Sequence, residues 1–307
     1  MSHRYTLFGQ ILHSTLPCPE LLQADVTEPP DILIDYDDLS EPLVAPSFAN
    51  HWLQIRPGIC RILIEDIASY QIEAGRTIRV DPLPGTDAGD VRLFLLGTAM
   101  GILLHQQGRL PLHVSAIAHD GQSLAFCGAS GAGKSTLAAG LSQKGFPLLC
   151  DDVGLVMLDT QGRPWFYPGF PRIKLWGEAI DHLGIERDGL IPDQTRTDKY
   201  HLRLHDFTQH FHTEPLPLTR LYDLAPTADT SPARIEALDR HETLALAIAH
   251  TYRPMMLRRI GNPVAHLEQC GYLANAVRGY RYHRPFTLKA FEASLAVLIE
   301  HIEGAGT

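Results

Sequence analysis

The sequence predicts an α/β fold with a mixed central sheet, preceded by a β-rich N-terminal region. The first observation is an apolar run at 124–127, which leads through a glycine-rich loop into an apolar-faced helix expected at 134–143; this order is typical of α/β domains. The second is that prolines and short β-type runs fill the first 80 residues, which argues against long helices there. The 307 residues suffice for one large α/β domain, or for a domain of about 200 residues with a smaller companion. We therefore expect a β-rich region at 1–85 and an α/β domain at 86–307, divided within the Pro-, Gly- and Asp-rich loop at 81–90.

Short strands are expected in the N-terminal region where β-branched and apolar residues gather, at 32–34, 59–65 and 72–80. The tripeptide Ala74-Gly75-Arg76 lies between two such runs and predicts a turn. Prolines punctuate the same region at Pro17, Pro19, Pro29, Pro30, Pro42 and Pro46.

A helix is expected next, over 91–107, with Asp90 as its N-cap and Gly108 as its end. Its most apolar part, 93–104, is much shorter than the roughly 20 residues that span a bilayer, so we expect a buried core helix. Two strands follow at 112–118 and 123–127, joined by His119-Asp120-Gly121-Gln122. An Asp-Gly pair between apolar runs indicates a β-hairpin.

The rest of the chain alternates strands and helices. Beyond the helix at 134–143, which Gly145 ends, we expect strands at 147–150, 153–158, 164–167, 218–224, 233–238 and around 279–283, and helices at 176–183, 242–251, 263–276 and 288–302.

The glycine loop matches the pattern G-x-x-x-x-G-K-[ST] in full. Glycines let backbone N–H groups turn towards phosphate oxygens, and the positive end of the following helix points at the same anions. In this pattern the lysine reaches the β- and γ-phosphates and the serine hydroxyl binds Mg²⁺. The strand–loop–helix context disfavours the alternative of a chance glycine turn, so the loop predicts a site for ATP or GTP with Mg²⁺. The predicted nucleotide-binding residues are Gly128, Ala129, Ser130, Gly131, Ala132, Gly133, Lys134, Ser135 and Thr136.

Two adjacent carboxylates, Asp151 and Asp152, follow the apolar strand at 147–150. The carboxyl end of a strand is where α/β sheets place ligands. Neighbouring strand residues point to opposite faces, so the two side chains should act differently. One is expected to bind Mg²⁺, for which we take Asp151, and the other to accept a proton from an attacking hydroxyl. The alternative is an aspartate pair that caps a turn.

The combination of His113, the loop at 128–135 and the pair Asp151-Asp152 resembles the catalytic core of the HPr kinase/phosphorylase family, over about residues 110–152. The resemblance implies a P-loop HPr-kinase-like core. It implies that Lys134 binds phosphate, Ser135 binds Mg²⁺, Asp152 is the proton acceptor and His113 is a further active-site residue.

A looser resemblance extends to both sides of that core and joins the chain to the broader group of HPr-kinase-like proteins, some of which phosphorylate lasso-peptide precursors. It is carried by Phe94-Leu95-Leu96-Gly97, Leu110-Pro111-Leu112-His113, Pro171-Arg172-Ile173-Lys174-Leu175-Trp176 and Asp198-Lys199-Tyr200. The Glu- and Gly-rich signature that follows the Asp pair in HPr kinases themselves, with its metal-binding glutamate, is absent here. The resemblance thus implies a kinase that transfers the γ-phosphoryl group to a serine hydroxyl of a small protein or peptide, such as a lasso-type precursor, and not HPr kinase itself.

Basic residues downstream of the Asp pair are candidates for contact with phosphate or substrate: Arg172, Lys174 and Lys199. The equally weighted alternative is that Arg172 and Lys174 are solvated charges on one face of a strand. His201 and His205 are spaced for a metal pair on a helix, but the alternation of Leu202 and Leu204 suits a strand as well, and no third ligand is evident.

Composition narrows the partners and the compartment. A formal charge of −9 gives no basic footprint for nucleic acid or an anionic membrane. The five cysteines are scattered without a C-x-x-C pair, and the stretch at 1–10 is polar, so we expect neither disulfides nor a signal peptide, as in a cytoplasmic protein. The expected partner is a small protein or peptide acceptor, and homo-oligomerisation stays open. The alternatives are a small-molecule kinase, a nucleotide hydrolase, although no N-K-x-D motif is present, and a nucleotide-sensing regulator.

Overall fold

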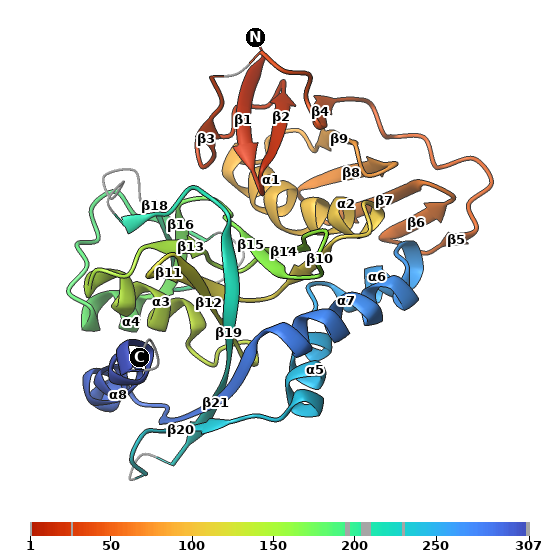
Figure 1. Ribbon diagram of the computed structural model, residues 1–307. Coiled ribbons are helices and arrows are strands. Elements are labelled where there is room, and N and C mark those ends of the chain that lie inside the picture. Colours follow the sequence, from red (N-terminus) through yellow and green to blue (C-terminus); the bar gives the residue numbers. More distant parts are fainter. Residues whose placement is uncertain (1, 26, 194–196, 204–209, 229–230, 305–307) are drawn as a thin grey trace. The chain divides into compact units, whose positions relative to one another are not determined.

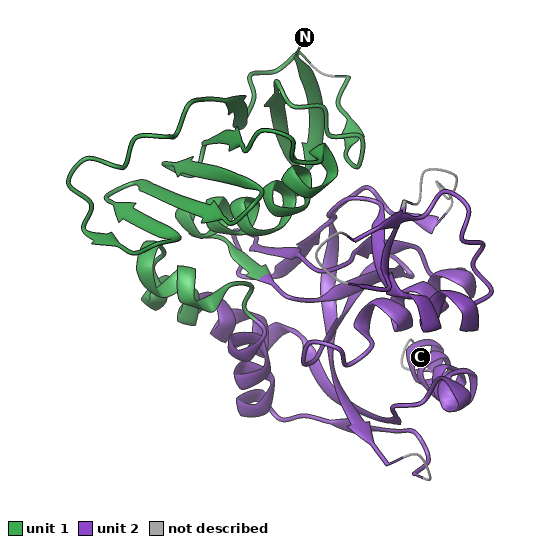
Figure 2. Ribbon diagram, turned by 180° about the vertical axis from the view of Figure 1, so that it is seen from behind, with its two compact units in different colours: residues 1–111, 251–268 green, residues 112–250, 269–307 purple. Residues whose placement is uncertain are grey.

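The computed structural model describes residues 2–25, 27–193, 197–203, 210–228 and 231–304. The chain forms two compact units (Figure 2). Unit 1 contains Met1–Pro111 and Thr251–Glu268, and unit 2 contains Leu112–His250 and Gln269–Thr307. The first unit thus extends beyond residue 85, where we expected the boundary, and it also takes in a segment from late in the sequence.

Unit 1 is built on a nine-stranded sheet in the order β3-β1-β2-β4-β9-β8-β7-β6-β5 (Figure 1). The β2–β4 and β4–β9 pairs are parallel, and the other pairs are antiparallel. The expected turn at Ala74-Gly75 joins β8 to β9, and both residues have positive φ. The strands are β1 (His3–Leu7), β2 (Gln10–Ser14), β3 (Leu22–Gln23), β4 (Ile32–Tyr36), β5 (Phe48–Ala49), β6 (Leu53–Arg56), β7 (Ile59–Ile64), β8 (Ala68–Glu73) and β9 (Thr77–Pro82).

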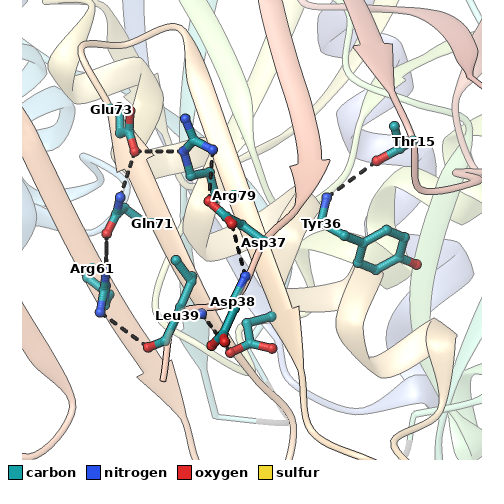
Figure 3. Close-up of polar contacts among 10 residues, drawn as sticks. Thr15, Tyr36, Asp37, Asp38, Leu39, Arg61, Gln71, Glu73 and Arg79 are labelled. Atoms are coloured by element: carbon teal, nitrogen blue, oxygen red, sulfur yellow. Dashed lines mark hydrogen bonds and ion pairs between the residues drawn. The ribbon is translucent and has the colours of Figure 1, made fainter. Parts of the chain in front are cut away.

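One face of this sheet is apolar and the other is polar, as period-two alternation requires. Ile62, Tyr70 and Ile78 are fully buried on the first face. On the second, hydrogen bonds and ion pairs cross the strands in a chain (Figure 3). Its members, Arg61, Gln71, Glu73, Arg79 and Asp37, are joined at distances of 2.5–2.9 Å. The polar face therefore satisfies its own side chains.

A helical run from Ala88 to Gln106 lies against the apolar face and explains why unit 1 extends past residue 85. It consists of α1 (Ala88–Phe94), a π-helical segment η1 (Leu95–Ala99) and α2 (Met100–Gln106). The Tyr70 hydroxyl donates to the Val91 carbonyl at 2.7 Å and thereby ties the run to β8. Among the described residues, this run is the one helix that is long and apolar enough to cross a membrane. However, 67% of its most apolar window is buried inside the protein, as in a core helix.

The N-cap of this run is Asp87, whose side chain accepts from the Gly89 N–H at 2.7 Å, so the expected cap at Asp90 is wrong. Asp90 lies in the first turn instead, where its charge favours the positive helix end. Gly108, with φ of 69°, follows the end of the run as expected.

Unit 2 has a mixed sheet flanked by helices, which confirms the α/β class and the mixed central sheet. The strand order is β10-β14-β15-β19-β12-β11-β13, with β21 beside β19 and β20 beside β21. The β12–β19 and β19–β21 pairs are parallel, whereas β11 is antiparallel to both β12 and β13. The strands are β10 (Leu110–Leu112), which begins in unit 1, β11 (Ser115–His119), β12 (Gln122–Cys127), β13 (Leu148–Cys150), β14 (Gly154–Leu158), β15 (Pro164–Tyr167), β19 (Leu216–Thr227), β20 (Arg234–Ala237) and β21 (Arg278–Pro285).

A smaller sheet of three strands has the order β16-β18-β17. Helix α3 packs against β11, β16 and α8, and Gly140 leaves no room for a Cβ beside Phe291. The remaining elements of the chain are β16 (Arg172–Trp176), β17 (Ile191–Pro192), β18 (Lys199–Arg203), α3 (Lys134–Gln143), α4 (Gly177–His182), α5 (Arg240–Ala249), α6 (Pro254–Ile260) in unit 1, α7 (Pro263–Ala276), which begins in unit 1, η3 (Leu288–Ala290) and α8 (Phe291–Gly304).

Several local predictions for unit 2 are confirmed. Helix α3 has the expected bounds. The turn of the β11–β12 hairpin has positive φ at both Asp120 and Gly121, as a type I′ turn requires. Cys127, Cys150 and Cys270 of unit 2, like Cys18 and Cys60 of unit 1, have free and buried thiols.

Candidate active site

The glycine loop follows β12 and leads into α3. Its glycines Gly128, Gly131 and Gly133 have φ of 149°, 85° and 84°, which residues with a Cβ rarely adopt. A Cβ on Gly128 would also press on the side chains of Ala132 and Leu224, at 3.1 and 3.2 Å. Gly133 is the N-cap of α3 and offers no side-chain cap, so side chains do not occupy the first N–H groups of the helix. The loop and the helix end together form a cradle suited to an anion.

Lys134, the first residue of α3, turns its side chain back over the loop. Its ammonium donates to the carbonyls of Gly128 and Ala129 at 2.9 and 3.2 Å. The side chain is buried, and burial lowers its pKa against the opposing pull of Asp151, Cys127 and Asp152. The ammonium therefore lies within the loop that would hold phosphates.

Asp151 connects four segments of unit 2. Its Oδ1 accepts from the hydroxyls of Ser135 and Ser115 at 2.9 and 2.6 Å, and its Oδ2 accepts from the backbone N–H of Lys174 at 3.0 Å. The carboxylate is thereby fixed beside the loop serine. Ser115 has no place in the motif that defines the loop, and no pattern in the sequence indicated it.

The Ser135–Asp151 pair matches the donor chemistry of a magnesium site. In P-loop proteins Mg²⁺ is held by the loop serine or threonine and by a strand-end aspartate, with the remaining positions taken by water and phosphate oxygens. A hydroxyl and a carboxylate 2.9 Å apart provide that donor set. The described residues contain no cluster of three or more His, Cys, Asp or Glu side chains that could hold a metal.

Asp152 has different partners from Asp151. Its Oδ2 lies 3.2 Å from the Lys174 ammonium and its Oδ1 lies 3.3 Å from Nδ1 of His113. Burial disfavours its charged form, but the Lys174 charge and the His113 hydrogen bond outweigh burial and hold the pKa of Asp152 well below its usual range. The residue is a carboxylate at neutral pH and can accept a hydrogen bond from a hydroxyl. Its backbone has φ of 82°, a conformation that is costly for a residue with a Cβ.

His113 lies between β10 and β11, and its backbone N–H donates to the His250 carbonyl at 2.7 Å. That bond fixes the chain where the imidazole faces Asp152. The structure thus brings His113, Lys134, Ser135, Asp151 and Asp152 together at the carboxyl ends of β12 and β13. Thr136, the next residue of α3, is half-buried.

Of the three basic candidates, one lies in the aspartate cluster and two lie against aromatic rings. Lys174 belongs to the cluster, because its ammonium pairs with Asp152. Arg172 is buried, with its guanidinium 4.6 Å from the Phe170 ring centre, so neither residue is a solvated surface charge. Lys199 lies opposite Trp176 in the β16–β18 pair, and Trp176 is two positions beyond Lys174 on β16. The Lys199 ammonium is 5.4 Å from the Trp176 ring centre.

His201 lies on β18, opposite Lys174, so the strand alternative holds for this segment. Its Nε2 is 3.3 Å from Oδ2 of Asp193, in a buried position. Burial, with the charges of Arg172 and Lys174, lowers its pKa to about 4 despite the carboxylate. The other member of the considered metal pair, His205, lies outside the described residues.

Arg284 is a residue at the loop that no motif indicated. It lies on β21, and its Nη2 donates to the Ala132 carbonyl at 2.7 Å. A Cβ on Gly133 would collide with the same guanidinium. Ala132 and Arg284 are 152 positions apart in the sequence, and the parallel pairing of β12, β19 and β21 brings them together.

No family model matches the chain, and no curated protein matches it. Among solved structures, the HPr(Ser) kinase/phosphatase from Coxiella burnetii matches over 64% of this chain and 99% of that chain, at 11% sequence identity and a TM-score of 0.33. At that TM-score the match does not establish a common fold. The α/β class of this chain rests on its own sheets and helices.

Proposed function

We propose that this chain is a P-loop kinase that transfers the γ-phosphoryl group of Mg²⁺-bound ATP or GTP to a hydroxyl. The observation that supports this most is the division of labour between the two aspartates. Asp151 is bound to the loop serine, whereas Asp152 faces a lysine and a histidine. A second ionised carboxylate, supported by its own cation, can orient an O–H nucleophile beside the γ-phosphate, and the resemblance of the motifs to HPr-kinase-like proteins favours an alcohol over water as that nucleophile.

The acceptor hydroxyl is placed at Asp152. Its O–H donates to a carboxylate oxygen while its oxygen attacks the γ-phosphorus and the bond from that phosphorus to the β–γ bridging oxygen breaks. The proton passes to Asp152, and the leaving diphosphate keeps the electron pair of the broken bond. Because the transition state for phosphoryl transfer is loose, the proton leaves late. A carboxylate with a lowered pKa therefore serves mainly to orient the hydroxyl. Lys174, which pairs with that carboxylate, stays close to the negative charge of the transferring phosphoryl group.

Lys134 and the loop stabilise the leaving group. The Lys134 ammonium would exchange its loop carbonyls for β- and γ-phosphate oxygens, as a point charge that follows the developing negative charge. Mg²⁺, when bound through Ser135 and Asp151, supplies charge neutralisation on the same oxygens. His113 holds Oδ1 of Asp152 from the other side and so fixes the direction of the second carboxylate oxygen.

The acceptor class rests on the resemblance of the motifs to HPr-kinase-like proteins. We propose a serine of a small protein or peptide, of which a lasso-type precursor peptide is one example, and a cytoplasmic location. Homo-oligomerisation belongs to the same proposal. Neither nucleic acid nor a membrane is a partner in it, because the chain is acidic.

The matched variants Asp152→Asn and Asp151→Asn test the division of labour. Both keep the side-chain shape and remove one charge. Asp152→Asn should bind Mg-ATP with a Kd within about threefold of the wild type and lose about a hundredfold or more in phosphoryl transfer. Asp151→Asn should need a higher Mg²⁺ concentration for half-maximal nucleotide binding. If Asp152→Asn transfers phosphate at more than a tenth of the wild-type rate, Asp152 is not the proton acceptor.

A further inference from the structure

The loop at 128–135 has a second flank, on the side away from the aspartates. In the sheet order, β11 and then β13 lie on one side of β12, and β19 with its neighbour β21 lies on the other. β12, β19 and β21 are parallel, so their carboxyl ends reach the same edge of the sheet. Figure 1 shows β19 and β21 running together through unit 2. The loop is therefore flanked by the Asp151–Asp152 pair on one side and by the end of β21 on the other.

Arg284 occupies this second flank with its charge unmatched by any carboxylate. The residue is 5% exposed, and its hydrogen-bond acceptor among the described residues is the Ala132 carbonyl. Burial lowers its pKa, and Tyr282 is the sole group whose charge opposes that shift. By contrast, Arg281 on the same strand pairs with both Asp223 and Glu242. Among the described residues, then, the Arg284 guanidinium is a buried cation that has no anionic partner.

A buried guanidinium costs free energy unless it finds an anion or enough acceptors for its five N–H donors. Arg284 lies against the backbone of Ala132 and Gly133, directly before the lysine that reaches the β- and γ-phosphates. The group that would complete its environment is an anion held at the same loop. The α-phosphate end of a nucleotide meets that description, because the γ-phosphate has to face Asp152.

Phe286 lies two residues beyond Arg284, just past the end of β21. It lies in the bend that follows the strand, and it is 55% exposed. An exposed aromatic ring this close in the chain to Arg284, which contacts the loop, offers a face on which a base can stack.

We propose that the nucleoside end of the bound nucleotide lies over the carboxyl ends of β19 and β21, with its base stacked on Phe286 and its α-phosphate side next to Arg284. This proposal rests on the proposed nucleotide site and adds the orientation of the nucleotide within it. A nucleotide whose γ-phosphate faces Asp152 has to leave the loop on the opposite flank, and Arg284 and Phe286 occupy that flank. Arg284 acts as a positioning residue for the loop, and Phe286 contacts the base.

Calorimetric titration with two probes tests this: ATP, which carries a base, and inorganic tripolyphosphate, which does not. Stacking on an aromatic side chain contributes about 1–3 kcal/mol per base, so Phe286→Ala should bind ATP between about fivefold and 150-fold more weakly. Its affinity for tripolyphosphate should equal that of the wild type, and Phe286→Trp should restore ATP binding. Tyr272→Ala is the matched control, since Tyr272 is 56% exposed and packs on Gly162, away from the loop.

The outcomes separate this proposal from the one beneath it. If wild type and Phe286→Ala bind ATP equally, the base lies elsewhere and the direction is wrong, while the nucleotide site stands. If Phe286→Ala weakens ATP and tripolyphosphate alike, the residue supports the fold of the loop and does not contact a base. If the wild type binds neither probe in the presence of Mg²⁺, both the nucleotide site and this direction are refuted.

Discussion

Replacing Lys174 by glutamine should destabilise the protein far more than replacing a surface lysine in an ion pair of the same length. Lys174 and Asp152 are 3.2 Å apart with side chains 15% and 28% exposed. Lys144 and Glu292 are 3.1 Å apart with side chains 47% and 61% exposed. The two pairs differ in burial and hardly in distance, so Lys144→Gln is the matched control for Lys174→Gln.

The expected size follows from Coulomb's law. Two unit charges 3.2 Å apart attract by about 1 kcal/mol if screened as in bulk water and by about 5 kcal/mol at an effective dielectric constant of 20. Because both side chains are partly buried, the attraction between them lies between these two energies. Removing Lys174 also leaves the Asp152 charge without its main partner. We expect Lys174→Gln to lower the free energy of unfolding by about 2–4 kcal/mol at pH 7, and Lys144→Gln by about 1 kcal/mol or less.

The pH dependence gives the prediction a second test. The folded-state pKa of Asp152 is lowered, so its ionisation stabilises the fold above the unfolded-state pKa of about 3.9, and this contribution is lost as the pH falls towards the folded-state pKa. In Lys174→Gln the folded-state pKa of Asp152 should move back towards its usual value, so the difference in stability from the wild type should narrow as the pH falls below about 4.

Urea unfolding followed by circular dichroism at several pH values measures both effects. Equal losses for Lys174→Gln and Lys144→Gln at pH 7 would refute the idea that the buried pair holds Asp152 ionised. A large loss for Lys174→Gln that stays constant from pH 7 down to pH 2 would show that lost packing, and not charge, is the cause.

Three further outcomes follow from the same geometry. Gly133→Ala should destabilise the protein by at least about 1 kcal/mol more than Gly131→Ala in thermal unfolding, because both have positive φ but only a Cβ at Gly133 would meet Arg284; equal shifts in Tm would contradict this. His201→Gln should remove part of the protein's loss of stability between pH 6.5 and pH 4. A histidine with a folded-state pKa of about 4 binds its proton first in the unfolded state, so the free energy of unfolding falls by up to about 3 kcal/mol as the pH drops through that window. If urea unfolding gives the same pH profile for the variant and the wild type, the lowered pKa of His201 is contradicted. Lys134→Ala should weaken Mg-ATP binding at least about tenfold by calorimetry with unchanged circular dichroism, and intact binding would exclude the loop as the phosphate site.

The parts of the fold that local chemistry decides were predictable from the sequence. Helix α3 has the expected bounds, and the hairpin turns at Asp120-Gly121, within the expected link at 119–122, because glycine and a short apolar run specify both within a few residues. The start of the helical run at Ala88 was misplaced by one turn, since Asp87 and Asp90 are both good caps and only tertiary contact chooses between them. Helix α6 was missed, although Pro254 at its first turn is a recognisable start signal.

The site divides in the same way. His113 and the two aspartates lie at strand ends, and Lys134 and Ser135 begin the helix that follows the glycine loop. All five are close together in sequence, so their meeting could be expected. The pairing of Lys174 with Asp152 depends on where β16 lies relative to β13, which the sequence left open against a solvated strand face. Arg284 reaches the loop only because β21 pairs with β19 and β19 with β12. No local pattern encodes that order.

The most direct test of the central claim follows the γ-phosphoryl group itself. The protein is incubated with Mg²⁺ and ATP labelled in the γ-phosphate, together with small proteins and peptides that carry serine, and the products are resolved by mass spectrometry. We predict that an acceptor hydroxyl gains one phosphoryl group carrying the label, and that Asp152→Asn abolishes the gain while still binding the nucleotide. If the label appears only as inorganic phosphate, or if no nucleotide is consumed with any acceptor, the site is not that of a hydroxyl kinase.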